Sequence, residues 1–160
     1  MCTNPLVSII MGSYNAEQTI NECFKSIEEQ TYKNWEFIIC DDCSTDNTYS
    51  ILESLAEKES RIKLIRNDKN IKLAATLNRC LQIAQGKYIA RMDADDKCDA
   101  RRLSKQVEYL ENHPDIDCVG TNRIVFDDEG NRTIRKSDEF PIAEHLLKGP
   151  PFAHPTIMTN

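Results

Sequence analysis

Short apolar segments alternate with amphipathic ones along the first two thirds of the chain, and this alternation constrains the fold more than any other feature. Buried-strand signals lie at residues 6–11, 35–40, 62–65 and 87–92. Apolar stripes with helical spacing follow each of them, at residues 20–27, 51–56, 73–84 and 103–110. This β-α-β-α-β-α-β-α order predicts an α/β domain with an open, mostly parallel sheet and helices on both faces.

Local signals predict where the helices begin and end. Asn15 and Gln18 are spaced as a capping box for the first helix. Residues 44–46 supply caps for the second helix, Gly86 is expected to end the third, and Asp99 is expected to cap the fourth.

The pattern changes after the fourth helix. Residues 116–126 and 131–135 flank an acidic turn and predict a C-terminal hairpin. We expect a short helix at residues 142–147 and a last strand at residues 152–158. A length of 160 residues fits one domain, and we find no linker within residues 1–160.

Composition excludes several classes of protein. The net charge of −6 argues against a nucleic-acid-binding protein, which needs a basic face. No apolar run approaches the roughly 20 residues that span a bilayer, and the first residues lack a signal-peptide pattern. We therefore expect a cytoplasmic location. Seven irregularly spaced cysteines, including the pair Cys40 and Cys43, indicate reduced thiols rather than disulfides or a zinc site.

Polar residues follow the predicted strands, at the sheet edge where parallel sheets bind ligands. Ser13, Tyr14 and Asn15 follow the first strand, and Asp41 and Asp42 follow the second. Lys72 lies beyond the third strand. Glycine-rich phosphate motifs and a serine nucleophile elbow are both absent, which argues against a nicotinamide or Walker-type site.

The fourth strand ends in Asp93-Ala94-Asp95-Asp96. Clustered carboxylates repel one another unless a cation compensates them, and Mg²⁺ or Mn²⁺ suits such oxygen ligands. A solvated acidic loop is the alternative interpretation. However, the helix cap at Asp99 leaves Asp93, Asp95 and Asp96 unexplained.

Taken together, the ordered motifs resemble family-two glycosyltransferases, whose fold is the Rossmann-like GT-A fold. The matching segments are residues 7–15, 41–46, 70–78 and 86–96, followed by Arg102, Leu103, Gln106, residues 119–121 and residues 154–156. The resemblance covers nearly the whole chain. Gly12, Cys43 and Lys72 depart from the family pattern, since many members have proline at the first position and glycine at the other two.

The resemblance implies inverting transfer of a sugar from a nucleotide-diphospho-sugar, expected to be a UDP-sugar, to a saccharide or lipid-linked acceptor. The pathway implied is the biosynthesis of surface polysaccharide or glycoconjugate. It also implies a Mn²⁺ or Mg²⁺ cofactor. The residues that the resemblance implies for binding the nucleotide sugar are Ser13, Tyr14, Asn15, Asp41, Asp42, Lys72, Asp93 and Ala94. Asp95 with Asp93 would bind the metal. Asp96 and His154 would line the site.

The same resemblance divides the chain into a nucleotide-binding part, about residues 1–99, and the start of an acceptor-side part, residues 100–160. The acidic catalytic base is expected beyond Asn160, so the chain is expected to be C-terminally truncated. Homo-oligomerisation and peripheral membrane attachment of a longer protein stay open. The alternatives are a sugar nucleotidyltransferase, a receiver-like signalling module and a non-catalytic nucleotide- and metal-binding module.

Overall fold

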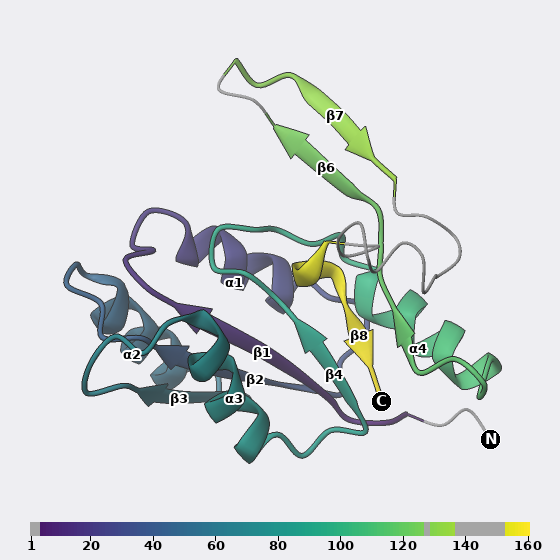
Figure 1. Ribbon diagram of the computed structural model, residues 1–160, viewed down its shortest axis with the longest axis horizontal. Coiled ribbons are helices and arrows are strands. Elements are labelled where there is room, and N and C mark those ends of the chain that lie inside the picture. Colours follow the sequence, from purple (N-terminus) through teal and green to yellow (C-terminus); the bar gives the residue numbers. More distant parts are fainter. Residues whose placement is uncertain (1–3, 127–128, 137–152) are drawn as a thin grey trace.

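The computed structural model describes residues 4–126, 129–136 and 153–160, and its main sheet has six strands in the order β3-β2-β1-β4-β8-β5 (Figure 1). The parallel strands are β1 (Val7–Ser13), β2 (Trp35–Asp41), β3 (Ile62–Arg66) and β4 (Tyr88–Arg91). Strand β8 (Met158–Thr159) runs antiparallel between β4 and β5 (Cys118–Val119). The expected mostly parallel α/β sheet is confirmed.

Helices cover both faces of this sheet, as expected. Helices α1 (Ile20–Glu28), α2 (Thr48–Lys58) and α4 (Arg102–Asn112) contribute to the larger core with Val7, Ile9 and Met11 of β1. Helix α3 (Leu73–Ile83) covers the opposite face, over Ile10 and Ile38. Because successive strand residues point to opposite faces, continuous apolar strands supply both cores.

The residues of helix α3 that are buried differ from those of the predicted apolar stripe. Leu73 and Leu81 are largely exposed, and Thr76 and Cys80 are the buried residues that face the sheet. The prediction that Gly86 ends this helix is wrong, because the helix ends at Ile83. Glycine is needed there for another reason. A Cβ at residue 86 would lie 2.5 Å from the Ser8 amide nitrogen of β1.

Two predicted helix caps are also wrong. The first helix begins only at Ile20, and Asn15 instead accepts the Thr45 amide proton with its side-chain oxygen at 2.9 Å. Asp99 lies two residues before the N-cap of α4, and Gln30 accepts the Leu103 amide at 3.1 Å in its place. The cap expected from residues 44–46 is present, because the Asp46 carboxylate accepts the Thr48 amide of α2.

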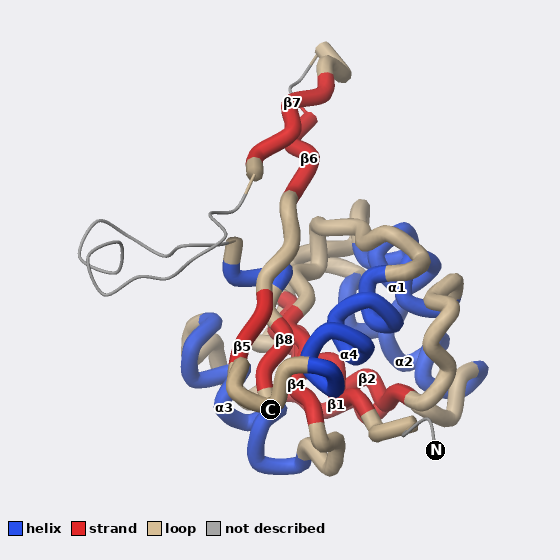
Figure 2. Tube along the Cα trace, turned by 90° about the vertical axis from the view of Figure 1, so that its right-hand side faces the viewer, coloured by secondary structure: helices blue, strands red, loops and turns tan. Residues whose placement is uncertain are grey.

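The predicted strand at residues 116–126 is divided between two sheets. Its first part is β5, whereas β6 (Arg123–Phe126) pairs antiparallel with β7 (Arg132–Arg135) in a separate hairpin, so the hairpin prediction is confirmed. This hairpin projects away from the main sheet (Figures 1 and 2).

The strand predicted at residues 152–158 is largely wrong. A 3₁₀ helix occupies His154–Thr156, and within residues 153–158, which the structure describes, only Met158 belongs to a strand. Pro155 fixes its own φ and lacks an amide proton, which disfavours a ladder at this point. The predicted helix at residues 142–147 lies outside the described residues. Within the described part of the chain, no helix has the length and apolarity that a bilayer crossing requires.

Candidate functional site

A cleft of about 470 Å³ opens at the carboxyl ends of the parallel strands. It brings together five of the residues singled out from the sequence: Tyr14, Asn15, Asp93, Ala94 and Asp95. The remaining lining residues are Gly12, Ala16, Glu17, Gln18, Thr19, Asp46 and Leu73. The cleft thus joins the loop after β1 to the acidic end of β4.

Ser13 and Asp41 are register partners at the ends of β1 and β2, and neither side chain lines the cleft. Both are buried, and neither Ser13 Oγ nor Asp41 Oδ1 has a hydrogen-bond partner among the described residues. The other Asp41 oxygen accepts the Ser44 amide and lies 3.2 Å from Arg66 Nε. Burying an oxygen without a hydrogen-bond partner costs free energy. A ligand that donates a hydrogen bond to this pair would therefore be stabilising.

Asp42 is engaged differently, because it holds the loop between β3 and α3. Its carboxylate accepts hydrogen bonds from Asn67 Nδ2 at 2.7 Å and from the amides of Ile71 and Lys72 at 2.8 and 2.9 Å. Burial alone would raise the pKa of Asp42, but these hydrogen bonds outweigh it and lower that pKa. Of the two adjacent aspartates, only Asp41 therefore has an unoccupied oxygen.

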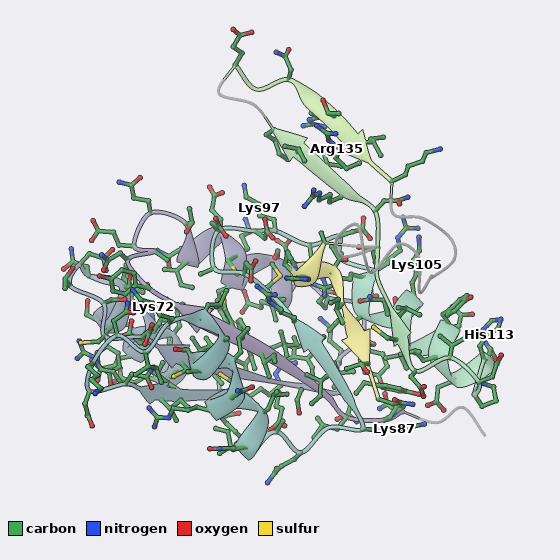
Figure 3. The ribbon with its side chains drawn as sticks, in the orientation of Figure 1. Lys72, Lys87, Lys97, Lys105, His113 and Arg135 are labelled. Carbon is green, nitrogen blue, oxygen red and sulfur yellow. The ribbon has the colours of Figure 1, made fainter. Side chains whose placement is uncertain are left out.

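Among the residues that the structure describes, three other than glycine have positive φ, and all three lie in the loops at this edge of the sheet. Asn15, Cys43 and Lys72 have φ values of 50°, 62° and 72°. Cys43 and Lys72 are the positions that depart from the glycine of the family pattern, so the structure explains that glycine: the backbone is left-handed there. Lys72 is exposed, and Figure 3 shows it at the sheet edge that carries the strand ends.

The acidic end of β4 places its three carboxylates in different surroundings. Asp93 Oδ1 forms an ion pair with Arg91 Nη2 at 2.9 Å, whereas Asp95 and Asp96 are exposed. Surrounding protein atoms reduce the solvation of the Asp96 carboxyl although its side chain reaches solvent, and this effect, with repulsion from Asp95 and Asp93, raises the pKa of Asp96. The pKa of the Cys23 thiol beneath them is raised to about 12 by burial and, further, by the same negative charges.

This donor set fits a divalent metal that a ligand also coordinates. Among the described residues no group of three or more His, Cys, Asp or Glu side chains could hold an ion alone. Asp93 and Asp95 offer two carboxylates at the cleft, and Mg²⁺ or Mn²⁺ is usually held by one or two carboxylates together with substrate phosphates.

His154 is exposed on its 3₁₀ helix and does not line the cleft. The segment that carries it is fixed beside β4 by two buried side chains of α4. Arg102 Nη2 donates to the main-chain oxygens of Arg91 and Ile157 at 2.8 and 3.3 Å. Gln106 Nε2 donates to the Thr156 oxygen at 2.8 Å.

Sequence reasoning missed two cations that contact the predicted carboxylates. Arg91 pairs with Asp93, and Arg66 pairs with Asp41. The first pair had a usable signal, because Asp93 comes two residues after Arg91, the last residue of β4, and side chains two apart in extended backbone point to the same side. The second pair joins residues 25 positions apart through the β2–β3 register, in which Arg66 is the partner of Asp41.

Comparison with known proteins gives one consistent result. The family model described as glycosyl transferase family 2 matches residues 8–157. The putative glycosyltransferase EpsE of Bacillus subtilis (strain 168) is 51% identical over 159 residues, covering 99% of this chain and 57% of EpsE. WfgD of Escherichia coli, named UDP-Glc:alpha-D-GlcNAc-diphosphoundecaprenol beta-1,3-glucosyltransferase, is 45% identical over 106 residues, covering 66% of this chain and 41% of WfgD.

A solved structure gives the same result for the fold. The mannosyltransferase PcManGT from Pyrobaculum calidifontis, in complex with GDP-Man and Mn²⁺, matches with a TM-score of 0.70 and 30% sequence identity. The match covers 75% of this chain and 36% of that one. The chain thus spans about half the length of the curated relatives that it matches.

Proposed function

Because the chain belongs to glycosyl transferase family 2, we propose that it forms the donor-binding part of an enzyme that transfers a sugar from a nucleotide-diphospho-sugar to an acceptor hydroxyl. The observation that carries this proposal is the cleft that joins the loop after β1 to Asp93-Ala94-Asp95. The loop after β1 that lines the cleft follows Ser13, whose register partner is Asp41, and the cleft also carries the carboxylates suited to a metal.

The base we propose is uracil. Its ring N–H would supply the hydrogen bond that the buried Asp41 Oδ1 lacks, and Ser13 Oγ lies on the paired residue of β1. Arg66 covers Asp41 with a side chain that is 43% exposed and can rotate away. WfgD, whose name includes UDP-Glc, supports uridine as the nucleoside. PcManGT was solved with GDP-Man, so the identity of the base is tested separately below.

The metal we propose is Mn²⁺ or Mg²⁺, held by Asp95 and Asp93 together with the donor diphosphate. A bound divalent ion would stabilise the negative charge of the departing nucleoside diphosphate. Arg91 orients Asp93 from the strand side. Lys72 stands at the same edge, where its exposed ammonium can neutralise a diphosphate. The Mn²⁺ in the PcManGT complex supports this choice of ion class.

For the acceptor half we propose transfer with inversion. Inversion needs a general base within reach of the acceptor hydroxyl. We do not assign that task to Asp93 or Asp95, since a metal held by them would keep both charged and poor at accepting protons. Residues 1–99 would hold the donor and residues 100–160 would begin the acceptor side. WfgD, whose name includes a diphosphoundecaprenol-linked sugar, supports a lipid-linked acceptor. The pathway we propose is polysaccharide biosynthesis.

A thermal-shift panel tests the proposal. UDP with Mn²⁺ is expected to raise the melting temperature more than GDP or ADP with Mn²⁺, and more than UDP with a chelator. The absence of stabilisation by every nucleoside diphosphate would overturn the proposed function. Mn²⁺-dependent hydrolysis of a UDP-sugar would further distinguish an enzyme from a module that only binds nucleotide.

A further inference from the structure

The cation at the end of β4 contacts one of the two proposed metal ligands. Arg91 Nη2 donates to Asp93 Oδ1 at 2.9 Å, and the Arg91 side chain is only 17% exposed. Asp93 lines the cleft, and its second oxygen, Oδ2, has no hydrogen bond within the described part of the chain. One oxygen of Asp93 is therefore already bound to a cation, and the other is available to a metal.

A second guanidinium lies near the same carboxylates. Arg102, the first residue of α4, is 7% exposed and forms no ion pair among the residues that the structure describes. Burial lowers the pKa of Arg102, and the negative charges of Asp96 and Asp93 oppose this effect. Because arginine stays protonated in proteins, Arg102 is a fixed positive charge close to these two aspartates.

The acidic end of β4 therefore has little negative charge left for a metal. Two guanidiniums face the carboxylates of Asp93, Asp95 and Asp96, so that one of the three negative charges remains uncompensated. Lys97 does not add to this compensation, because it pairs with Glu22 of α1. Mg²⁺ loses its hydration water reluctantly and is usually held by one or two carboxylates together with substrate phosphates. A nucleoside diphosphate would bring the negative charge that the two arginines have cancelled.

We propose that Arg91 prevents a divalent ion without nucleotide, hereafter a bare ion, from binding at Asp93 and Asp95, so that metal and nucleoside diphosphate are taken up together. This inference rests on the proposed function, because it concerns the same donor site. The charge of Arg91 repels the ion and also neutralises the carboxylate that the ion needs. The diphosphate reverses this balance, because its negative charges attract both the ion and the guanidinium. If Arg91 only oriented Asp93, its removal would instead weaken the binding of a bare ion.

A titration with Mn²⁺ in the absence of nucleotide tests the proposal, with the free ion followed by electron paramagnetic resonance. Arg91→Met is expected to bind bare Mn²⁺ at least about tenfold more tightly than the parent. Arg91→Gln keeps a hydrogen-bond donor for Asp93 but removes the charge, so it should behave like Arg91→Met even if that variant folds poorly. Arg91→Lys keeps the charge and should bind bare Mn²⁺ as weakly as the parent. Saturating UDP is expected to strengthen Mn²⁺ binding to the parent at least about tenfold, since the coupling of two ligands is reciprocal.

Two further variants show whether the effect is local. Lys58→Met makes the same change in net charge at the exposed last residue of α2, and it should leave the affinity for bare Mn²⁺ unchanged. Combining Asp93→Asn with Arg91→Met should abolish the gain, because the carboxylate that Arg91 neutralises is then missing. Arg102 is less suitable for substitution, since its side chain also holds Ile157 beside β4. The melting temperature of each variant without metal shows whether the fold is retained.

Three results would overturn the proposal. The first is a parent chain that binds bare Mn²⁺ as tightly as Arg91→Met and Arg91→Gln do. The second is weaker binding of bare Mn²⁺ by these two variants, which orientation of Asp93 alone would predict. The third is an equal gain in Lys58→Met, which would show an effect of net charge only. Failure of every nucleoside diphosphate to bind the parent would instead overturn the proposed function, and the titration without nucleotide would still decide the effect of Arg91.

Discussion

Ser13 and Asp41 are register partners at the ends of β1 and β2, and each keeps one side-chain oxygen buried without a hydrogen-bond partner in the described part of the chain. Folding has therefore already desolvated two oxygens at the carboxyl ends of β1 and β2. In the proposed function, the bound nucleotide provides the hydrogen-bond donor that these oxygens lack.

Ser13→Ala tests this relationship. Removing a buried hydroxyl that has no partner is expected to leave the free energy of unfolding unchanged or raise it by up to about 1 kcal/mol, while UDP affinity falls about three- to tenfold. Ser26→Ala is the matched control, because Ser26 Oγ donates to the Cys23 oxygen and accepts the Cys98 amide. It should lose about 1 kcal/mol of stability and keep UDP affinity. The assignment would be contradicted if Ser13→Ala lost stability in urea unfolding and kept its affinity for UDP in titration.

Lys72 combines a strained backbone with a cation, and two substitutions separate these properties. With φ 72° and ψ 158°, Lys72 has a backbone conformation that costs a non-glycine residue about 1–3 kcal/mol. Glycine avoids this strain but loses more conformational entropy on folding, which offsets part of the gain. Lys72→Gly is therefore expected to raise stability by up to about 1 kcal/mol, and Lys72→Ala is not. Both should weaken UDP binding several-fold, as measured by calorimetry. Unchanged affinity in both variants would exclude Lys72 from the donor site.

Gly86→Ala is expected to destabilise the fold, although glycine at this position does not end a helix. The added Cβ would lie 2.5 Å from the Ser8 nitrogen and 2.8 Å from the Leu6 oxygen, both of which are backbone atoms that cannot rotate away. We expect a loss of about 1–3 kcal/mol in chemical unfolding. Asn78→Ala, an exposed change in α3, should have little effect. Equal stability of the two variants would contradict this prediction, because it would show that the backbone at residues 6–8 can move away from residue 86 at no cost in free energy.

Glu59 gives the chain an acid-sensitive contribution to stability. A hydrogen bond from the Arg61 side chain lowers the pKa of Glu59 from 4.5 to about 2. Because the folded-state pKa is the lower one, this stabilisation is complete above about pH 4.5 and is lost as the pH falls toward 2. We expect Glu59→Gln to remove roughly 2 kcal/mol at pH 6 and much less at pH 2.5, after allowance for partial exposure. Glu57→Gln, in the last turn of α2, should lack this pH dependence in urea titrations.

The regular part of the fold was predictable from the sequence because its strands are buried on both faces. Every residue of β2 is buried, and such continuous apolar segments are typical of parallel strands. The hairpin was predictable from its turn residues. Neither signal depends on contacts between distant segments.

The predictions that failed concern positions that distant contacts decide. Asn15 has the sequence signature of a helix cap, but its side chain binds the Thr45 amide of another loop. Gln30 caps α4 from the end of α1, a relationship that no local pattern contains. At the site, sequence reasoning left Asp41 and Asp42 equivalent. The loop amides of Ile71 and Lys72 distinguish them, because they occupy only Asp42.

The most direct test of the proposed donor site is a calorimetric titration of UDP into the parent chain and the Asp95→Asn variant, with and without Mn²⁺. Asp95 is exposed at the cleft, so the variant should fold normally. Asp115→Asn, an exposed change after α4, is the matched control. We predict that Mn²⁺ strengthens UDP binding at least tenfold in the parent and in Asp115→Asn, and that Asp95→Asn abolishes this gain because an amide is a poorer ligand for a hard cation. Binding of UDP that is equally tight in all three chains with and without Mn²⁺ would contradict the metal-assisted donor site.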